Sequence, residues 1–207
     1  MELEQAILGR RMVRRFVPDR QVSPQTLQRI AELALRAPSA GFSQGWDFVV
    51  LQEPDAREAF WTATTDDGPP DSWLQGVRTA PTLIVCCSDK GTYLRRYAES
   101  DKPWQDQDEL HWPVPYWDVD TGMAALLMLL VAVDEGLGGL FFGVEVDRQA
   151  AVHEALDIPA DRTIVGVVAI GYADQDRPSG STRRRRRRKV PEVFHSGTFG
   201  TPLGQGR

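Results

Sequence analysis

The stretch RAPSAGFSQGWDFVV, residues 36–50, joins a predicted helix to a predicted strand and is the most informative segment of the chain. Pro38 ends the helix, because proline lacks a backbone N–H and disfavours helical geometry in the residue before it. Small and polar residues follow, and Trp46 then opens an apolar strand. Such a loop lets backbone groups approach a flat ligand closely. It is therefore either an ordinary connection or part of a ligand site.

Helical and strand patterns alternate on both sides of this loop. Ser23 and Pro24 suit the start of a helix, as cap and first residue. Glycine and proline in residues 66–73 predict a loop, and three Trp with three Pro in residues 99–117 predict an irregular aromatic loop or lid. The order predicts a three-layer α/β or α+β domain. We expect helices over 2–9, 23–37, 54–64, 91–97, 118–135 and 148–156, strands over 46–52, 80–88 and 163–173, and a strand or extended turn over 140–146.

Charge is unevenly spread along the 207 residues, whose net charge is −5. Residues 177–207 hold nine Lys and Arg residues and one Glu, a net charge of +8, so the remaining chain carries −13. The length and the 42% apolar content suit one domain with a substantial core. We expect a single domain over residues 1–207, with residues 178–207 as a basic C-terminal arm.

The two cysteines, Cys86 and Cys87, lie next to each other in a predicted strand. Adjacent strand side chains point to opposite faces, which argues against a disulfide between them. The longest apolar run, residues 123–133, is shorter than a bilayer requires, and residues 1–10 show no signal-peptide core. These features indicate a soluble cytoplasmic protein with no membrane partner.

Two basic runs raise the question of which anion the protein binds. GRRMVRRF at residues 9–16 follows a helix, and Arg10, Arg11 and Arg14 either form a solvated charged turn or converge on a phosphate through bidentate hydrogen bonds. The six arginines at 183–188 are open to three readings: a solvated tail, a nucleic-acid contact, or a run of which a few members reach a ligand phosphate. Nucleic acid is disfavoured, because the rest of the chain is acidic and carries no nucleic-acid-binding signature.

The sequence lacks the motifs of several common binding and catalytic sites. GLGGLFFG at residues 136–143 follows a helix rather than a strand and does not match the dinucleotide-binding fingerprint. Neither a phosphate-binding loop of the Walker type nor a G-x-S-x-G nucleophile turn occurs in the sequence. His111, His153 and His195 are too far apart for a metal-ligand motif, so we expect no metal site.

Four segments taken together resemble the nitroreductase family of FMN-dependent oxidoreductases. They are RRMVRRF, APSAGFSQGWDFVV, DEGLGGLFFG and the basic segment before VPEVFH, in matching order and spacing over nearly the whole chain. The resemblance implies an α+β fold: a three-layer sandwich whose central sheet is mixed, mainly antiparallel, and flanked by helices. It also implies an intertwined homodimer with FMN at the interface and residues 118–135 as the dimer core.

The resemblance also implies a function. It is ping-pong hydride transfer from NADH or NADPH, through FMN, to a planar electron-poor acceptor such as a nitroaromatic or a quinone. The flavin carries this chemistry, so no catalytic side chain is implied. The implied cofactor-binding residues are Arg10, Arg11, Met12 and Arg14 near the phosphate and flavin; Pro38, Ser39, Ala40 and Phe42 from the partner chain; Phe141, Phe142 and Gly143 along the reactive face; and Arg187 and Lys189 as a second phosphate clamp.

Three positions depart from the family pattern. Met12 stands where Ser is usual, Phe42 where Asn is common, and Gly45 where Pro is common. The first two motivate an alternative function, a flavin- or deazaflavin-binding protein with little turnover. A nucleic-acid-associated protein that uses the arginine run is the other alternative.

Overall fold

The computed structural model describes residues 1–66, 68–175 and 184–204. Its contacts divide the chain into two compact units, Met1–Asp176 and Arg177–Arg207. The helices of the first unit are α1 (Leu3–Gly9), α2 (Pro24–Ala34), α3 (Pro54–Thr64), α4 (Ser72–Val77), α5 (Lys90–Tyr97), α6 (Tyr116–Asp134) and α7 (Gln149–Ala155). Its strands are β1 (Trp46–Leu51), β2 (Thr82–Ser88), β3 (Gly138–Phe142) and β4 (Thr163–Gly171). Short 3-10 turns are η1 (Ala40–Phe42), η2 (Glu109–His111), η3 (Val146–Arg148) and, in the second unit, η4 (Val190–Glu192).

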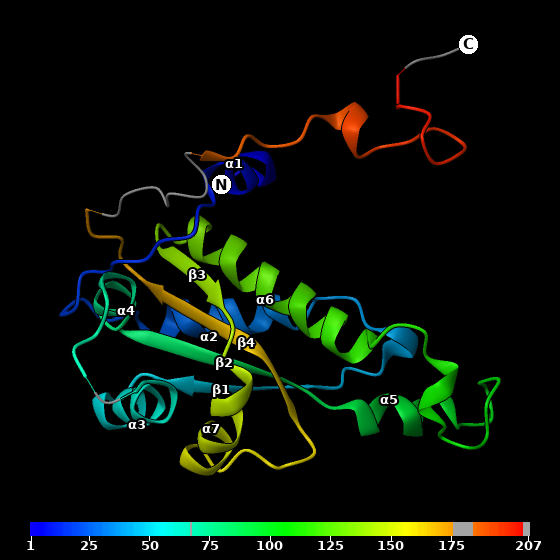
Figure 1. Ribbon diagram of the computed structural model, residues 1–207, viewed down its shortest axis with the longest axis horizontal. Helices are drawn as coiled ribbons and strands as arrows, with labels where there is room; N and C mark the ends of the chain where they lie inside the picture. Colours follow the sequence, from blue (N-terminus) through cyan, green and yellow to red (C-terminus); the bar gives the residue numbers. More distant parts are fainter. Residues whose placement is uncertain (67, 176–183, 205–207) are drawn as a thin grey trace. The chain divides into compact units, whose positions relative to one another are not determined.

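The four strands form one sheet in the order β1-β2-β4-β3, and every pair of neighbours is antiparallel. Helices α2 and α6 pack together on one face, and α3 and α7 cover the other (Figure 1). A bridge between Met12 and Gly139 adds a short parallel contact at the β3 edge. The predicted α+β three-layer sandwich, with a mainly antiparallel sheet, is confirmed.

Strand β2 shows why the sheet has a core on both faces. All seven of its residues are buried. Leu83, Val85 and Cys87 belong to the core under α3 and α7, whereas Ile84 and Cys86 belong to the core under α2 and α6. The two thiols therefore point to opposite faces and are free, as the alternation predicted. Burial raises the pKa of Cys86 to about 12 and that of Cys87 to about 11, so both stay protonated and unreactive at neutral pH.

Helix α2 begins as its sequence predicts. Ser23 accepts a hydrogen bond from the Thr26 N–H at 3.1 Å, and Pro24 occupies the first turn. The helix ends at Ala34, four residues before Pro38. Ile30 and Ala34 form its buried face against α6.

In a single chain, helix α6 is buried on one face and exposed on another. Ala124, Ala125, Met128, Leu129 and Ala132 pack into the core. Tyr116, Val119, Met123 and Leu126 are exposed, and their spacing of three, four and three residues places them on one stripe. By length and composition α6 is the one helix of the described chain that could cross a membrane, and half of that apolar window is buried inside the fold.

The structure differs from the sequence prediction in detail at two places. The loop expected over residues 66–73 gives way to α4 at Ser72, where Asp71 caps the helix by accepting from the Leu74 N–H at 2.7 Å. The strand or extended turn predicted over 140–146 is β3, which spans Gly138–Phe142; Gly136, with a φ of +72°, follows the end of α6, and Gly138 and Gly139 lie inside the strand. The Asp71 cap is a local contact between residues three apart, whereas the β3 glycines lie against Val13 and Leu129 from distant parts of the chain.

Candidate functional site

The N-terminal arginine run lies along the edge of the sheet. After α1 the chain becomes extended, and the Val13 N–H donates to the Gly139 carbonyl at 2.9 Å. The side chain of Val13 fills the space that a Cβ on Gly138 would need, 2.8 Å away. The missing side chain at Gly138 thus allows this close approach, and the run lies beside the strand that ends at Phe142.

The arginine side chains occupy different environments. Arg10 is half-buried, and its Nη1 is a buried donor without a hydrogen-bond partner among the described residues. The Arg14 Nη1 donates to the Met12 carbonyl at 2.8 Å. Arg11 and Arg15 are exposed. Because a buried unpaired guanidinium nitrogen is costly, Arg10 is the strongest structural indication of an anionic ligand here.

Met12, one of the three departures from the family pattern, has a packing role. Its half-buried side chain contacts the hydrophobic cores on both faces of the sheet. An apolar residue fits this position because it closes the sheet edge between the two cores. Its predicted contact with a flavin remains a prediction.

Residues of α4 and of the turn after it contact the backbone of the arginine run. Thr79, just after the helix, accepts a hydrogen bond from the Phe16 N–H at 2.8 Å. A Cβ added to Gly76 would lie 2.2 Å from the carbonyl oxygen of Arg14. Glycine is therefore required at position 76 for the run to keep its path.

Gly76→Ala should lower the free energy of unfolding by about 1–3 kcal/mol, because backbone must move to admit the methyl group. Gly9→Ala is the matched control, since its Cβ would meet only the Val133 Cγ1 at an ordinary 3.5 Å. Urea unfolding of both variants measures the difference. Equal stabilities would show that α4 does not hold the run.

Strand β3 ends at a cavity of about 570 Å³. Phe141 packs toward the α2 and α6 face, and Phe142 toward the α3 and α7 face. Gly143 is exposed, and a Cβ built on it would find no heavy atom of the described chain within 4 Å. The predicted segment Phe141–Gly143 thus borders open space.

Aromatic rings form the wall of this cavity. The Phe142 ring stacks on Trp61 at 5.9 Å between centroids with planes 8° apart, and Trp73 meets it edge-on at 5.5 Å. Arg148 pairs with Asp66 and Arg78 pairs with Glu58 at 2.8 Å. The cavity is lined by residues of α3, α4, the loop between them and the segment after β3, including Thr64, Pro69, Pro70, Asp71, Val144 and Glu145.

Sequence reasoning missed this aromatic wall. No residue of 66–79 was assigned a role, and Trp61 lies in the middle of an unremarkable helical pattern. The one available signal was Trp73, a large aromatic residue beside a Gly/Pro loop. Its neighbours come from separate elements, so only the folded chain brings them together.

The loop at residues 38–44 lies elsewhere in the molecule. Asp120, buried in α6, accepts hydrogen bonds from the Ala40 N–H at 2.9 Å and from the Tyr93 hydroxyl at 2.8 Å. Burial, together with the bond to Asp120, raises the pKa of Tyr93, so its hydroxyl stays a donor. Asp120 was not predicted; its signal is a lone carboxylate within an otherwise apolar helix.

The predicted site residues therefore form two groups at opposite ends of α6. The loop of Ser39, Ala40 and Phe42 is held at Asp120, whereas the N-terminus bonds to Asp134. Asp120 and Asp134 are 14 positions apart, which corresponds to about 21 Å along the helix. Within one chain, the arginine run and this loop do not meet.

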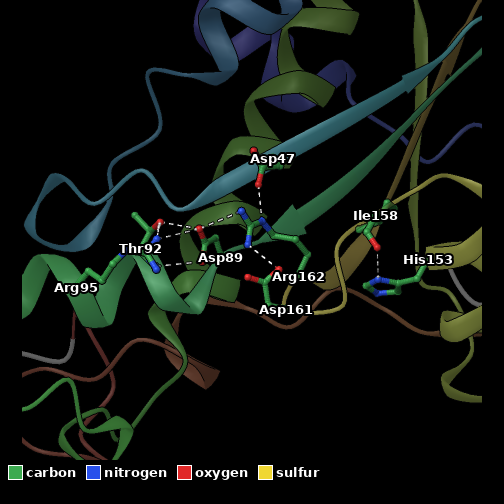
Figure 2. A network of polar contacts seen from close by, with 8 residues as sticks. All are labelled: Asp47, Asp89, Thr92, Arg95, His153, Ile158, Asp161 and Arg162. Atoms are coloured by element: carbon green, nitrogen blue, oxygen red, sulfur yellow. Dashed lines mark hydrogen bonds and ion pairs between the residues drawn. The ribbon is translucent and has the colours of Figure 1, made fainter.

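A polar network fixes the start of α5, the helix beside the loop (Figure 2). Arg162 donates from Nε to Asp47 at 2.6 Å and pairs with Asp89 at 3.3 Å. Asp89 caps α5 by accepting from the Thr92 N–H at 3.1 Å. Burial by itself raises the pKa of Asp89, but the Thr92 hydrogen bonds and the Arg162 charge lower it below its usual value. The carboxylate thus stays charged and holds α5 in place.

Figure 2 also shows His153 apart from this network. Its Nδ1 lies 3.1 Å from the Ile158 carbonyl oxygen, where it ties the end of α7 to the following turn. Among the described residues, no group of three or more His, Cys, Asp or Glu side chains is placed to hold a metal.

The segment at residues 99–117 forms an aromatic cluster. Trp104 stacks with Tyr97, at 5.3 Å between ring centroids, and with His111, at 4.6 Å. Trp112 meets Tyr97 edge-on at 4.6 Å. The loop is thus packed on α5, and α6 begins at Tyr116, two residues earlier than expected.

The second unit holds the remaining predicted residues. Arg187 and Lys189 are exposed, and Arg186 pairs with Glu192 at 2.8 Å. Arg183 lies outside the described residues. The phosphate-clamp role of Arg187 and Lys189 stays a prediction.

The fold is a three-layer α+β sandwich with an arginine run along the β3 edge of its sheet. Residues 7–172, which make up most of the chain, match the nitroreductase family. The chain belongs to the nitroreductase family.

The relatives agree with this assignment. A protein of Archaeoglobus fulgidus, provisionally named an NADH dehydrogenase/NAD(P)H nitroreductase, is 29% identical over 83% of this chain and 85% of its own length. A Desulfovibrio desulfuricans structure, solved in complex with FMN, has a TM-score of 0.70 at 24% identity and covers 96% of this chain and 98% of its own. An FMN complex from Exiguobacterium sibiricum has a TM-score of 0.70 at 20% identity, with 95% and 97% covered.

Proposed function

We propose that this protein is an FMN-dependent oxidoreductase that transfers reducing equivalents from NADH or NADPH to a planar electron-poor acceptor, such as a nitroaromatic or a quinone. The observation that carries the proposal is the Nη1 of Arg10 in the arginine run beside β3, which is buried and has no hydrogen-bond partner among the described residues. A dianionic phosphate would supply the missing partner through charge-assisted hydrogen bonds.

The residues present fit FMN in charge and in space. Arg10, Arg11 and Arg14 supply cations for the phosphate and the pyrimidine edge of the ring. The open position at Gly143 leaves room for a flat ring along the end of β3. When bound, FMN supplies the hydride chemistry. The chain itself then needs only to bind and orient FMN and the substrates and to exclude water from them.

The cavity beside Gly143 suits a planar acceptor. Trp61, Trp73 and Phe142 present aromatic surface, and Arg78 and Arg148 lie in the same lining. Aromatic rings favour stacked and edge-on partners, which matches a flat acceptor. Cationic groups nearby favour electron-poor molecules that bear nitro or carbonyl oxygens.

The site is completed by a second copy of the chain. The exposed stripe Tyr116, Val119, Met123 and Leu126 gives α6 an apolar face without a cover in one chain. If two α6 helices pack antiparallel about a two-fold axis, the arginine end of one helix meets the Ala40 end of the other. A homodimer thus joins the two groups of site residues that one chain keeps about 21 Å apart.

The purified protein should be yellow and should release non-covalent FMN on denaturation. The stripped protein should take up FMN and oxidise NADH or NADPH when a quinone is added. Absorbance, identification of the released cofactor and steady-state kinetics measure these results. A colourless protein that binds no added FMN would refute the proposal, and uptake of a deazaflavin in place of FMN would replace the cofactor assignment.

A further inference from the structure

The loop that presents Phe42 has an unusual backbone. Gly41, Phe42 and Gln44 have φ angles of +60°, +57° and +54°. A left-handed conformation is ordinary for glycine but strained for a bulky residue such as phenylalanine. The Phe42 side chain is nevertheless 76% exposed, so burial of its ring does not offset the strain within one chain.

Several contacts hold the strained loop in place. Asp120 is 4% exposed and accepts from both the Ala40 N–H and the Tyr93 hydroxyl. The Arg96 Nε donates to the Gly41 carbonyl at 3.0 Å. A Cβ on Gly41 would lie 2.6 Å from the Tyr97 ring, so the loop fits closely against α5.

An exposed aromatic ring on an anchored, strained loop indicates a ligand contact. Resting on the function and dimer proposed above, we propose that Phe42 is a specificity-determining residue. Its ring forms an aromatic wall for the acceptor at the flavin site of the partner subunit, and Asp120 and Tyr93 are positioning residues that hold it there. Phe42 contacts the acceptor rather than FMN.

Phe42→Ala should raise the KM for a naphthoquinone about three- to tenfold, because an aromatic stacking contact is lost. With ferricyanide, an inorganic acceptor that does not stack, the same variant should show a smaller rise in KM than with naphthoquinone. Its Kd for FMN, measured by flavin fluorescence, should change less than twofold. Phe42→Leu is the matched control that keeps apolar volume without the ring. Its KM for the naphthoquinone should fall between those of the wild type and of Phe42→Ala.

Asp120→Ala tests the positioning role. It should raise the naphthoquinone KM as Phe42→Ala does, and the double variant should be no worse than either single one. Backbone hydrogen exchange over residues 37–46 of the stripped protein should accelerate in Asp120→Ala. Asp120→Asn, whose side-chain oxygen can still accept from Ala40, should restore slow exchange and the original KM.

Three results would decide against the inference. An active, FMN-bound Phe42→Ala variant with an unchanged naphthoquinone KM overturns it and leaves the proposed function standing. A tenfold loss of FMN affinity in that variant makes Phe42 a cofactor contact instead. A wild-type protein that neither binds FMN nor turns over overturns the proposed function and this inference together.

Discussion

Leu126→Asp should dissociate the proposed dimer and lower FMN affinity at least about 100-fold. Leu126 is 49% exposed in one chain and lies on the apolar stripe of α6. In a two-fold interface the substitution buries two unpaired carboxylates, each of which costs several kcal/mol. FMN affinity should fall with dissociation, because each proposed site takes residues from both subunits.

Light scattering during gel filtration and FMN titration measure the two effects. Val50→Asp is the control: Val50 is also apolar and part-exposed, but it lies on β1 at the far edge of the sheet from β3. That variant should remain dimeric and bind FMN normally. A monomeric wild-type protein, or a Leu126→Asp dimer with full FMN affinity, would contradict the interface.

Arg10→Ala and Arg14→Ala should each weaken FMN binding about tenfold to a hundredfold. A charge-assisted hydrogen bond contributes about 1.5–3 kcal/mol, and about 1.4 kcal/mol corresponds to one decade of affinity. Removing Arg10 also removes a buried donor that has no partner in the described part of the chain, so the stripped protein should not lose stability at that position. Fluorescence titration of FMN into each stripped variant gives the affinity.

Arg15→Ala serves as the matched control within the same run. Arg15 is exposed, and its backbone carbonyl, rather than its side chain, accepts from the Asp174 N–H at 3.1 Å. The affinity of the Arg15→Ala variant for FMN should stay near that of the wild type. If Arg15→Ala weakens FMN as much as Arg14→Ala, the run acts only as a diffuse positive patch.

Local pattern was sufficient for most elements of the fold. Ser23 and Pro24 predicted the start of α2, and the unbroken apolar run of β2 predicted a strand buried on both faces. Cap chemistry and side-chain alternation act between near neighbours, so they can be read without a structure. Strand β3 was less clear, because its glycines look like a turn until Val13 and Leu129 are seen packed against them.

Only part of the candidate site could be predicted from local sequence patterns. The sequence by itself determined the cationic run, the small-residue loop and the family, because these depend on residue types at fixed spacing. Tertiary structure alone decided that the run lies along β3, that Asp120 holds Ala40, and that Trp61 and Trp73 flank Phe142. It also separated the two groups of site residues along α6 and left one face of that helix uncovered. Contacts between residues far apart in the chain arise from packing and chain topology, and no local propensity encodes them.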